Sequence, residues 1–410
     1  MTKGSHRCRN CKDPLIQTFV DLGLSPLSNA FISEEGLCQG EMYYPLHTYV
    51  CQNCLLVQLE EFETPATIFS DYAYFSSYSS SWLAHARRYV EHIMKRYSLS
   101  EDSFVVEVAC NDGYLLQYFI EEQMDVLGIE PAKNVAIKAE EKGIPIVKEF
   151  FGTLLAAQLA SKRKADVLIA NNVLAHVPDL HDFVKGLKML LQREGVITAE
   201  FPHLLQLMNE NQFDTIYHEH FSYFSLHTLQ HIFAVHGLTI YEVEELTTHG
   251  GSLRIYAGHT EDVDEVHESV SALLAQERSR GLHDVDQYAR FCQQVKESKA
   301  SILAFFLQVK QEGKTVVGYG APAKGNTLLN YCGIGKDFLP FTVDKSEFKQ
   351  GLYLPGTRIP IMHPDQITAT KPDYVFILPW NLKDEICAEM AHISSWGGRF
   401  VVPIPHIEVL

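Results

Sequence analysis

Four consecutive residues, Tyr217, His218, Glu219 and His220, all carry ionisable side chains. They offer a phenol, a carboxylate and two imidazoles, which are groups that enzymes use for proton transfer near neutral pH. If the run is helical, residues three apart share a face, so Tyr217 and His220 would point the same way and suit proton transfer. From the residues alone, two other interpretations stay open: a metal site, because His-x-His on a strand presents both rings to one face, and a partly buried polar loop.

Two Cys-x-x-Cys pairs lie near the start of the chain, Cys8 with Cys11 and Cys51 with Cys54. Each pair places two sulfurs within reach of one tetrahedral metal ion. Four thiolates fill the coordination shell and leave no open position, so we expect a structural zinc ion. A redox pair is the alternative, although no thioredoxin-like pattern accompanies either motif. The other five cysteines show no pattern and are expected to be core residues.

Hydroxyl groups and aromatic rings crowd the segment 71–82, which follows the second cysteine pair. One interpretation is a polar linker, in which a serine caps the helix that we expect from about Leu83 to Tyr97. The density of aromatic rings favours the other interpretation, in which the segment lines a pocket.

A strand, a turn, a helix and a second strand follow from Phe104 and predict a βαβ unit. The second strand ends in Glu130 just before Pro131, about where nucleotide-binding folds hold a ribose diol. Dinucleotide sites need several glycines in the first turn, whereas the turn 110–113 keeps only Gly113. S-adenosylmethionine has no phosphate, so a turn with fewer glycines and more side-chain acceptors suits it better. The residues therefore predict S-adenosylmethionine as the cofactor.

Two further strands are expected at 164–170 and 195–202, with a helix between them. The first runs into a polar loop that contains Asn171, Asn172 and His176. In Rossmann-like methyltransferases, the loop after this strand faces the methionine part of the cofactor. Each of the three side chains also has a simple role as a loop or cap residue, and both interpretations stay open.

The C-terminal third repeats the pattern of strand, glycine turn and helix at 314–329. A strand at 341–344 follows and again ends in an acidic residue, which indicates a duplicated fold. The Gly-x-Gly turn admits three interpretations: a nicotinamide site, an ordinary tight turn, or a phosphate site at a helix N-terminus. Lys324 adds a positive charge, so the diphosphate of a sugar nucleotide is a good candidate ligand.

The ordered motifs resemble those of the sugar C-methyltransferases of deoxysugar biosynthesis: two cysteine pairs, Tyr-x-Tyr-x-Ser-Ser, Glu-Val-x-Cys-Asn-Asp-Gly, Tyr-x-Glu-His and a late Gly-Tyr-Gly-Ala-x-Ala-Lys. The resemblance covers nearly the whole chain. It implies methyl transfer from S-adenosylmethionine to C-3 of a nucleotide-linked 4-keto-6-deoxyhexose. It also implies an α/β protein with a zinc-binding module, expected at 1–95, a Rossmann-like cofactor domain at 96–258, and a Rossmann-like domain at 259–410 that helps to hold the nucleotide sugar.

The resemblance assigns the chemistry to individual residues. His220 looks like the family's catalytic histidine, with Glu219, Tyr217 and Tyr74 beside it. His218 stands where the family can have an acidic residue, so two imidazoles compete for the role of base. The residues and the resemblance together predict three further groups: zinc ligands Cys8, Cys11, Cys51 and Cys54; cofactor-binding residues Glu107, Ala109, Asn111, Gly113, Glu130, Pro131, Asn171, Asn172 and His176; and substrate-binding residues Tyr72, Ser76, His249, Arg254, Tyr319, Lys324, Asp344, Lys349 and Asn381.

The charge balance limits the partners of the protein. Its 51 acidic and 34 basic residues give a formal charge of -17, which disfavours nucleic-acid polymers and anionic membrane surfaces. No apolar stretch approaches the ~18 residues that a membrane helix needs, and the N-terminus lacks a signal peptide. We therefore expect a soluble cytoplasmic protein that binds a nucleotide-diphosphate sugar, with a monomer as a plausible state.

Other functions stay open from the sequence. One keeps S-adenosylmethionine as the donor but moves the methyl group to a sugar oxygen or to another carbon acid. Another is a catalytically silent, zinc-stabilised protein that binds a nucleotide. A third alternative is a nicotinamide-dependent oxidoreductase, which is supported only by the Gly-x-Gly turn of the C-terminal third.

Overall fold

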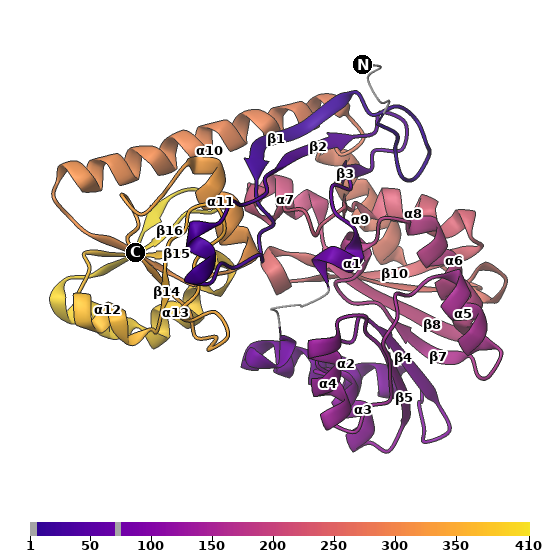
Figure 1. Ribbon diagram of the computed structural model, residues 1–410. Helices are drawn as coiled ribbons and strands as arrows, with labels where there is room; N and C mark the ends of the chain where they lie inside the picture. Colours follow the sequence, from indigo (N-terminus) through magenta and orange to yellow (C-terminus); the bar gives the residue numbers. More distant parts are fainter. Residues whose placement is uncertain (1–5, 70–74) are drawn as a thin grey trace.

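The computed structural model describes residues 6–69 and 75–410 (Figure 1). Its strands form three β-sheets, and most of its helices pack against the two larger ones. This architecture confirms the predicted α/β class, with a small N-terminal module followed by two Rossmann-like units. None of the described helices is long and apolar enough to cross a membrane. Tyr72 and Tyr74, predicted to be site residues, lie outside the described residues.

The N-terminal module is built on an antiparallel sheet of order β1-β2-β3-β9. Its strands are β1 (Gln17–Ser25), β2 (Tyr44–Val50), β3 (Val57–Leu59) and β9 (Ser222–Tyr223), and the short helix α1 (Pro65–Ile68) follows β3. Strand β9 comes from the central part of the chain and begins two residues after His220. In the β3–β9 ladder, Val57 pairs with Tyr223 and Gln58 with Ser222. Two remote parts of the chain therefore share one sheet.

The four predicted zinc ligands lie together at the end of this module. Their sulfurs are all within 4.8 Å of one another, and residues 6–69 and 75–410 hold no other group of this kind. Two of the sulfur pairs, Cys8 with Cys54 and Cys11 with Cys51, are 3.5 Å and 3.4 Å apart. A tetrahedral zinc ion with Zn–S bonds of ~2.3 Å separates its sulfurs by about 3.8 Å, so the cluster fits zinc.

The central unit is a sheet of order β10-β11-β8-β7-β4-β5-β6. Strands β4 to β8 are parallel, as the βαβ pattern predicts, and β11 and β10 add an antiparallel edge. The strands are β4 (Phe104–Val108), β5 (Asp125–Ile129), β6 (Ile146–Val147), β7 (Ala165–Ile169), β8 (Leu191–Pro202), β10 (Leu238–Leu246) and β11 (Ser252–His259).

Helices cover both faces of this central sheet. Val105 and Val106 are neighbours on β4, yet they lie in two separate hydrophobic cores, because successive side chains on a strand point to opposite faces. The core of Val105 receives α2 (Ser80–Arg96), α3 (Leu116–Glu121) and α4 (Lys133–Glu141). The core of Val106 receives α5 (Thr153–Ala160), α6 (Leu180–Leu190), α8 (Leu226–Val235) and α9 (Glu268–Ser279).

The C-terminal unit has a sheet of order β14-β13-β12-β15-β16-β17, in which only the last pair is antiparallel. Its strands are β12 (Val316–Tyr319), β13 (Thr342–Val343), β14 (Ile361–Met362), β15 (Tyr374–Ile377), β16 (Arg399–Val402) and β17 (Glu408–Val409). Its helices are α10 (Val285–Gln311), α11 (Ala323–Cys332), α12 (Asp365–Thr370) and α13 (Lys383–Glu389).

Helix α10 joins the N-terminal module to the C-terminal unit, and Figure 1 shows it running beside β1. The ring of Phe19 on β1 stacks on Phe291 of α10 at 4.9 Å and meets Tyr288 edge-on at 5.9 Å. All three rings are buried in a core that extends into the C-terminal sheet. The small module is therefore stabilised by packing against its neighbour as well as by its metal site.

Two helices near the expected domain boundaries pack with the central unit. Helix α2 lies mostly before residue 96, but Tyr89 and Ile93 pack in the same core as Val105. Helix α9 lies after residue 259, yet Glu277 accepts hydrogen bonds from the backbone N–H groups of Leu226 and His227, at the start of α8. The apolar face of a helix decides which unit holds it, and the composition of the linkers did not reveal that.

The metal site gives a first prediction. Replacing Cys8 by serine removes a ligand that only the thiolate form supplies, so Cys8→Ser should lose its zinc ion and unfold at a lower temperature. Elemental analysis should give one zinc ion per wild-type chain and much less in the variant. Cys38→Ser is the control, because Cys38 is exposed and lies outside the cluster. A Cys8→Ser protein with full zinc and full stability would refute the site.

Candidate functional site

The run from Tyr217 to His220 forms a tight turn and not a helix. The backbone N–H of His220 donates to the carbonyl of Tyr217 at 2.9 Å, which closes a β-turn. The turn still brings the first and last side chains together, because their ring centroids are 4.1 Å apart. The predicted pairing of Tyr217 with His220 is therefore present, although a different backbone conformation produces it.

The two histidines of the turn point to different surroundings. His218 donates from Nε2 to the carbonyl of Pro45 at 3.3 Å, and its ring meets Tyr44 and Phe62 edge-on. His218 is thus packed into the N-terminal module, where burial lowers its pKa to about 4. His220 is not part of this packing.

His220 is held from its other ring nitrogen. Its Nδ1 donates to the carbonyl of Thr215, at the end of the short helix η4 (Phe213–Thr215), at 2.9 Å. In a neutral imidazole with a proton on Nδ1, Nε2 is a hydrogen-bond acceptor. Burial lowers the pKa of His220 well below its usual value, and the nearby His176, His249 and Lys324 add to this effect. The ring is therefore neutral near pH 7.

His176, predicted as a cofactor residue, lies beside His220. It ends the short helix η3 (Leu174–His176), which follows β7, and its ring meets that of His220 edge-on at 4.8 Å. Its Nδ1 donates to the backbone carbonyl of Glu219 at 2.8 Å, and burial lowers its pKa to about 4. His176 thus links the loop after β7 to the turn of His220, a contact that the sequence did not reveal.

Glu219 is buried and faces the N-terminal module. Its carboxylate accepts a hydrogen bond of 2.6 Å from the side-chain amide of Asn29. Burial raises the pKa of Glu219 to about 7, and the bond from Asn29 opposes this rise. Within the described part of the chain, this carboxylate has no hydrogen bond to His220. Asn29 was missed from sequence, because nothing in its neighbours marks it.

The predicted cofactor turn follows β4 and is closed by Glu130 at the end of β5. One carboxylate oxygen accepts from the N–H of Asn111 and the other from that of Ala132, both at 2.9 Å. Each oxygen keeps a second lone pair, so Glu130 can still accept the hydroxyls of a ribose. Burial raises its pKa to about 7, and these two bonds oppose the rise. Pro131 stands between Glu130 and Ala132.

The backbone of the cofactor turn is unusual. Ala109, Asn111 and Gly113 all have positive φ angles, of 58°, 52° and 74°. At Gly113, a β-carbon would lie 2.2 Å from Cδ1 of Ile144, so this position requires glycine. Beneath the turn, burial raises the pKa of Glu107 well above its usual value. These residues form a close-packed cradle with carboxyl groups and no phosphate-sized glycine loop, which fits S-adenosylmethionine.

The segment rich in hydroxyls and aromatic rings is tied to this turn. The backbone N–H of Ser76 donates to Asn111 Oδ1 at 3.0 Å, and that of Ser77 donates to Asp112 Oδ2 at 3.1 Å. Lys142 donates to the hydroxyl of Ser77 at 2.8 Å. Ser76 thus contacts the cofactor turn, and the side chain of Ser79 caps α2 by accepting from the N–H of Trp82, as the linker interpretation expects. That the segment lines a pocket stays a prediction.

The loop after β7 supports the neighbouring strand. Asn171 accepts from the backbone N–H of Glu200 through Oδ1 at 3.1 Å, and the N–H of Asn172 donates to the carbonyl of Glu200 at 2.7 Å. The positive φ of Asn172, 53°, turns the chain at this point. Both asparagines therefore have a structural role, and contact with the cofactor stays a prediction for them.

Arg254 on β11 is engaged in a buried ion-pair network. Its Nη2 lies 2.6 Å from Glu200 and its Nη1 lies 2.7 Å from Glu244. His85 of α2 adds a third contact, because its Nε2 lies 3.0 Å from Glu200. Burial raises the pKa of Glu200, but His85 and Arg254 outweigh it and the pKa is lowered overall. Contact of Arg254 with a sugar stays a prediction.

The C-terminal unit reaches the site through Lys324 and Trp380. Lys324 donates to Asn381 Oδ1 at 2.8 Å, and its ammonium lies 4.3 Å from the centre of the Trp380 ring. Trp380 donates from its indole N–H to Asp214 at 2.7 Å. Burial lowers the pKa of Lys324 to about 8, and the nearby Asp214 opposes this. Burial also raises the pKa of Asp214 to about 6.

His249 lies at the same junction of domains. Its ring contacts Trp82 of α2 at 4.9 Å, and burial, reinforced by Lys324, lowers its pKa to about 4. The next residue, Gly250, accepts from Gln212 at 2.6 Å, and a β-carbon there would lie 2.6 Å from the Trp380 ring. The loop of His249 is therefore pressed between the central and C-terminal units, close to His220.

Three other predicted substrate residues surround the glycine turn after β12. Asp344 accepts from the N–H of Ala321 at 2.7 Å, and Lys349 donates to the carbonyl of Ala321 at 2.9 Å. Tyr319 is buried at the end of β12, where burial raises its pKa. These side chains hold the turn itself, and the structure groups them with Ala321 and not with His220.

The buried His218 gives a prediction about pH. Its folded pKa of about 4 lies below its ordinary 6.5, so between these values the folded protein binds fewer protons than the unfolded chain. His218 therefore contributes stability above pH 6.5 that is lost as the pH falls toward 4. The free energy of unfolding, measured with urea in this pH window, should depend on pH less steeply in His218→Gln than in wild type. The difference in slope should be up to about 1.4 kcal/mol per pH unit.

The control for this measurement is His92→Gln, at an exposed histidine of α2. It removes a histidine side chain that is exposed to solvent, so the unfolding free energy of this variant should depend on pH as that of the wild type does. Equal slopes for His218→Gln and His92→Gln would contradict the burial argument.

Comparison with solved structures finds methyltransferases. One is an S-adenosylmethionine-dependent methyltransferase from Clostridium acetobutylicum, with 11% identity, 43% of this chain and 92% of that chain covered, and a TM-score of 0.36. Another is the magnesium protoporphyrin IX methyltransferase of Synechocystis, with 16% identity and a TM-score of 0.33. This match covers 47% of this chain and 88% of that chain. At these TM-scores, neither likeness carries the argument further.

Comparison with sequences is more informative. The chain is 36% identical over 404 residues to the C-methyltransferase NovU of Streptomyces niveus. The aligned region covers 98% of this chain and 96% of that protein. Three family models match in order: a zinc binding domain at residues 8–69, a methyltransferase domain at 82–243, and a C-methyltransferase C-terminal domain at 247–405. With the cysteine cluster, they confirm zinc and S-adenosylmethionine as cofactors. The chain belongs to the sugar C-methyltransferase family, and it is an S-adenosylmethionine-dependent C-methyltransferase.

Proposed function

We propose that this enzyme methylates C-3 of a nucleotide-linked 4-keto-deoxyhexose and that His220 is the base. The observation that carries the proposal is the orientation of the His220 ring. Its Nδ1 is occupied by the carbonyl of Thr215, which leaves Nε2 as the proton acceptor, on a ring that contacts the rings of His176 and Tyr217. His218, the competing imidazole, uses its Nε2 within the N-terminal module.

The chemistry needs a neutral base next to a hydrogen-bond donor. His220 removes the proton from C-3, and the electron pair of that C–H bond moves to the C-4 oxygen as an enolate. Burial lowers the pKa of His220 and so keeps the ring unprotonated, and able to accept a proton, before the substrate is bound. S-adenosylmethionine, when bound by the residues around Glu130 and Asn111, supplies an electrophilic methyl group on a sulfonium. With the C-3 proton on His220, the enolate carbon would form the new C–C bond while the sulfur–methyl bond breaks and S-adenosylhomocysteine leaves.

The enolate oxygen needs stabilisation while it carries charge. Tyr217 is a candidate donor, since its ring lies 4.1 Å from that of His220. Tyr74, outside the described residues, is the other candidate from the sequence. The carboxyl group of Glu219 is not bonded to the His220 ring, so we assign it to the placement of the turn: its side chain is tied to Asn29 and its carbonyl to His176.

A sugar nucleotide as substrate is supported by the cation of the C-terminal unit. Lys324 is a half-buried cation that lowers the pKa values of both His220 and His249, so it lies close to both. It is also held by Asn381 and the face of Trp380. A fixed cation at the start of a helix suits a diphosphate, which would place the sugar between this unit and the central one. Asp344 and Lys349 keep the neighbouring turn in place.

The role of His220 can be tested without methyl transfer. In D2O and without the methyl donor, the wild-type protein should exchange the C-3 hydrogen of a 4-keto sugar nucleotide, chosen from a panel, as followed by proton NMR. His220→Gln should lose this exchange by about 100-fold or more, because general-base catalysis contributes that much. His218→Gln is the matched comparison and should lose less of this exchange, because His218 holds the turn through Pro45 and does not take the proton.

The same experiment separates the alternatives. If both histidine variants exchange C-3 as fast as wild type, His220 is not the base. When S-adenosylmethionine is then added to the same reaction, a product that carries an O-methyl signal and keeps its C-3 hydrogen would show that the protein methylates oxygen. Both results contradict the proposal.

Lys324 gives a prediction about substrate binding. Lys324→Met removes the cation but keeps a similar length, so the KM for the sugar nucleotide should rise about tenfold or more, while the Kd for S-adenosylmethionine stays the same. Lys296→Met is the control, because Lys296 is an exposed lysine on α10. Steady-state kinetics and calorimetry supply the two values. An unchanged KM in Lys324→Met would contradict the proposed contact between Lys324 and the diphosphate.

A further inference from the structure

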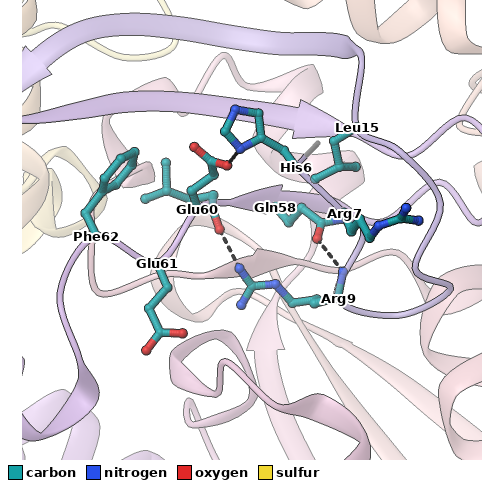
Figure 2. A pocket seen from close by; sticks show the side chains of 9 residues that line it. His6, Arg7, Arg9, Leu15, Gln58, Glu60, Glu61 and Phe62 are labelled. Carbon is teal, nitrogen blue, oxygen red and sulfur yellow. Dashed lines mark hydrogen bonds and ion pairs between the residues drawn. The ribbon is translucent and has the colours of Figure 1, made fainter. Parts of the chain in front are cut away.

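Arg9 stands inside the first cysteine pair, between Cys8 and Cys11, and its side chain turns away from solvent toward β3. Figure 2 shows it crossing a pocket of about 270 Å³ that lies between the first knuckle and the strand carrying Gln58. The pocket has charges of both signs, with Arg7 and Arg9 opposite Glu60 and Glu61. Glu60 pairs with His6, and within the described residues no carboxylate forms an ion pair with Arg9.

Hydrogen bonds connect Arg9 to both the metal ligands and β3. Its backbone N–H donates to the side chain of Gln58 at 2.8 Å, and Gln58 in turn donates to the sulfur of Cys8 at 3.2 Å. The guanidinium donates from Nη2 to the backbone carbonyl of Leu59, the last residue of β3. The first knuckle and the end of β3 are therefore held as one piece.

The end of β3 is where the segment after His220 is attached. The N–H of Leu59 donates to the carbonyl of Phe221 at 3.0 Å, so the residue directly after His220 is bound to the residue whose carbonyl Arg9 holds. The Arg9 guanidinium also lies 5.5 Å from the centre of the Phe221 ring. Two residues further on, Tyr223 meets the His220 ring edge-on at 6.1 Å. Arg9 thus contacts the chain just after His220, whereas Thr215 holds the His220 ring from just before the turn.

The cost of keeping an arginine here is informative. Its Nε and Nη1 are buried and have no hydrogen-bond partner among the described residues. A buried, poorly satisfied cation weakens a fold, and replacing buried charges by apolar side chains of similar size is often neutral or stabilising. A methionine would fill the same space without that cost. Stability alone is therefore a poor explanation for an arginine at position 9.

We propose that Arg9 is a positioning residue for the reaction, which rests on His220 being the base. It acts through Leu59 and Phe221: by holding the end of β3 and the Phe221 ring, it fixes the direction in which the His220 turn leaves the sheet. Without it, β9 can shift against β3, and the His220 ring moves relative to the C-3 hydrogen. Displacements of about 1 Å can lower rates by up to about 100-fold, so a small shift suffices.

The test compares Arg9→Met with Arg9→Lys and with Arg7→Met as the control. Arg7 belongs to the same knuckle but is exposed, and its guanidinium donates to the carbonyl of Lys12. We expect Arg9→Met to keep one zinc ion per chain, wild-type affinity for S-adenosylmethionine and a melting temperature equal to or above that of wild type. Its exchange of the C-3 hydrogen in D2O should nevertheless fall about tenfold or more.

Arg9→Lys should recover part of the exchange, because it keeps the charge but loses the planar fork that reaches Leu59. Arg7→Met should behave as wild type in every measurement. The combination of retained zinc, retained melting temperature and slow exchange distinguishes positioning from a structural role, which would lower all three together.

Two results would overturn the proposal. Exchange in Arg9→Met at the rate of Arg7→Met would show that Arg9 does not act on the turn. Loss of zinc or of melting temperature in Arg9→Met would make the residue structural. If His220 is not the base, the result differs: His220→Gln would then exchange the C-3 hydrogen at the wild-type rate, independently of the Arg9 variants.

Discussion

The short ladder between β3 and β9 is the constraint on which the site depends. Strand β9 begins two residues after His220, and its partner β3 follows the second cysteine pair by three residues. A strand of two residues has little stability of its own, so β9 exists because the module offers it an edge. The metal cluster orders the knuckles, the knuckles hold β3, and β3 fixes where the turn before β9 lies. A zinc site without an open coordination position thereby bears on chemistry that takes place elsewhere.

The other contacts of the run come from the remaining units, which explains why the turn lies at a three-way junction. From the central unit, His176 holds the carbonyl of Glu219. From the C-terminal unit, Thr327 donates to the carbonyl of Ile216 at 3.1 Å, and Trp380 donates to Asp214. Such burial has an electrostatic effect: desolvation keeps the histidines neutral and raises the pKa of Glu219, so the junction carries less charge than its composition suggests.

The sequence reveals the local patterns of this protein and misses the contacts between units. The cysteine spacing predicts the metal cluster, and the strand ending at Glu130 predicts the cofactor turn. Each of these motifs consists of residues that are close together in the sequence. Asn29 and Asp214 carry no such signal; each acquires its role from a partner more than 150 residues away, Glu219 and Trp380. The same applies to β9, whose two residues are too few for any periodicity to be read.

The two imidazoles of the run have different surroundings in the structure. On a strand, residues two apart share a face, and the metal interpretation of the run depends on that geometry. In the turn, the chain reverses between them, so His218 faces Tyr44 and Phe62 while His220 faces His176. Neither histidine belongs to the metal-binding group found among the described residues. The backbone of the turn, and not the acidity of either ring, therefore separates the two: His218 anchors the turn to the zinc module, which leaves His220 facing the junction.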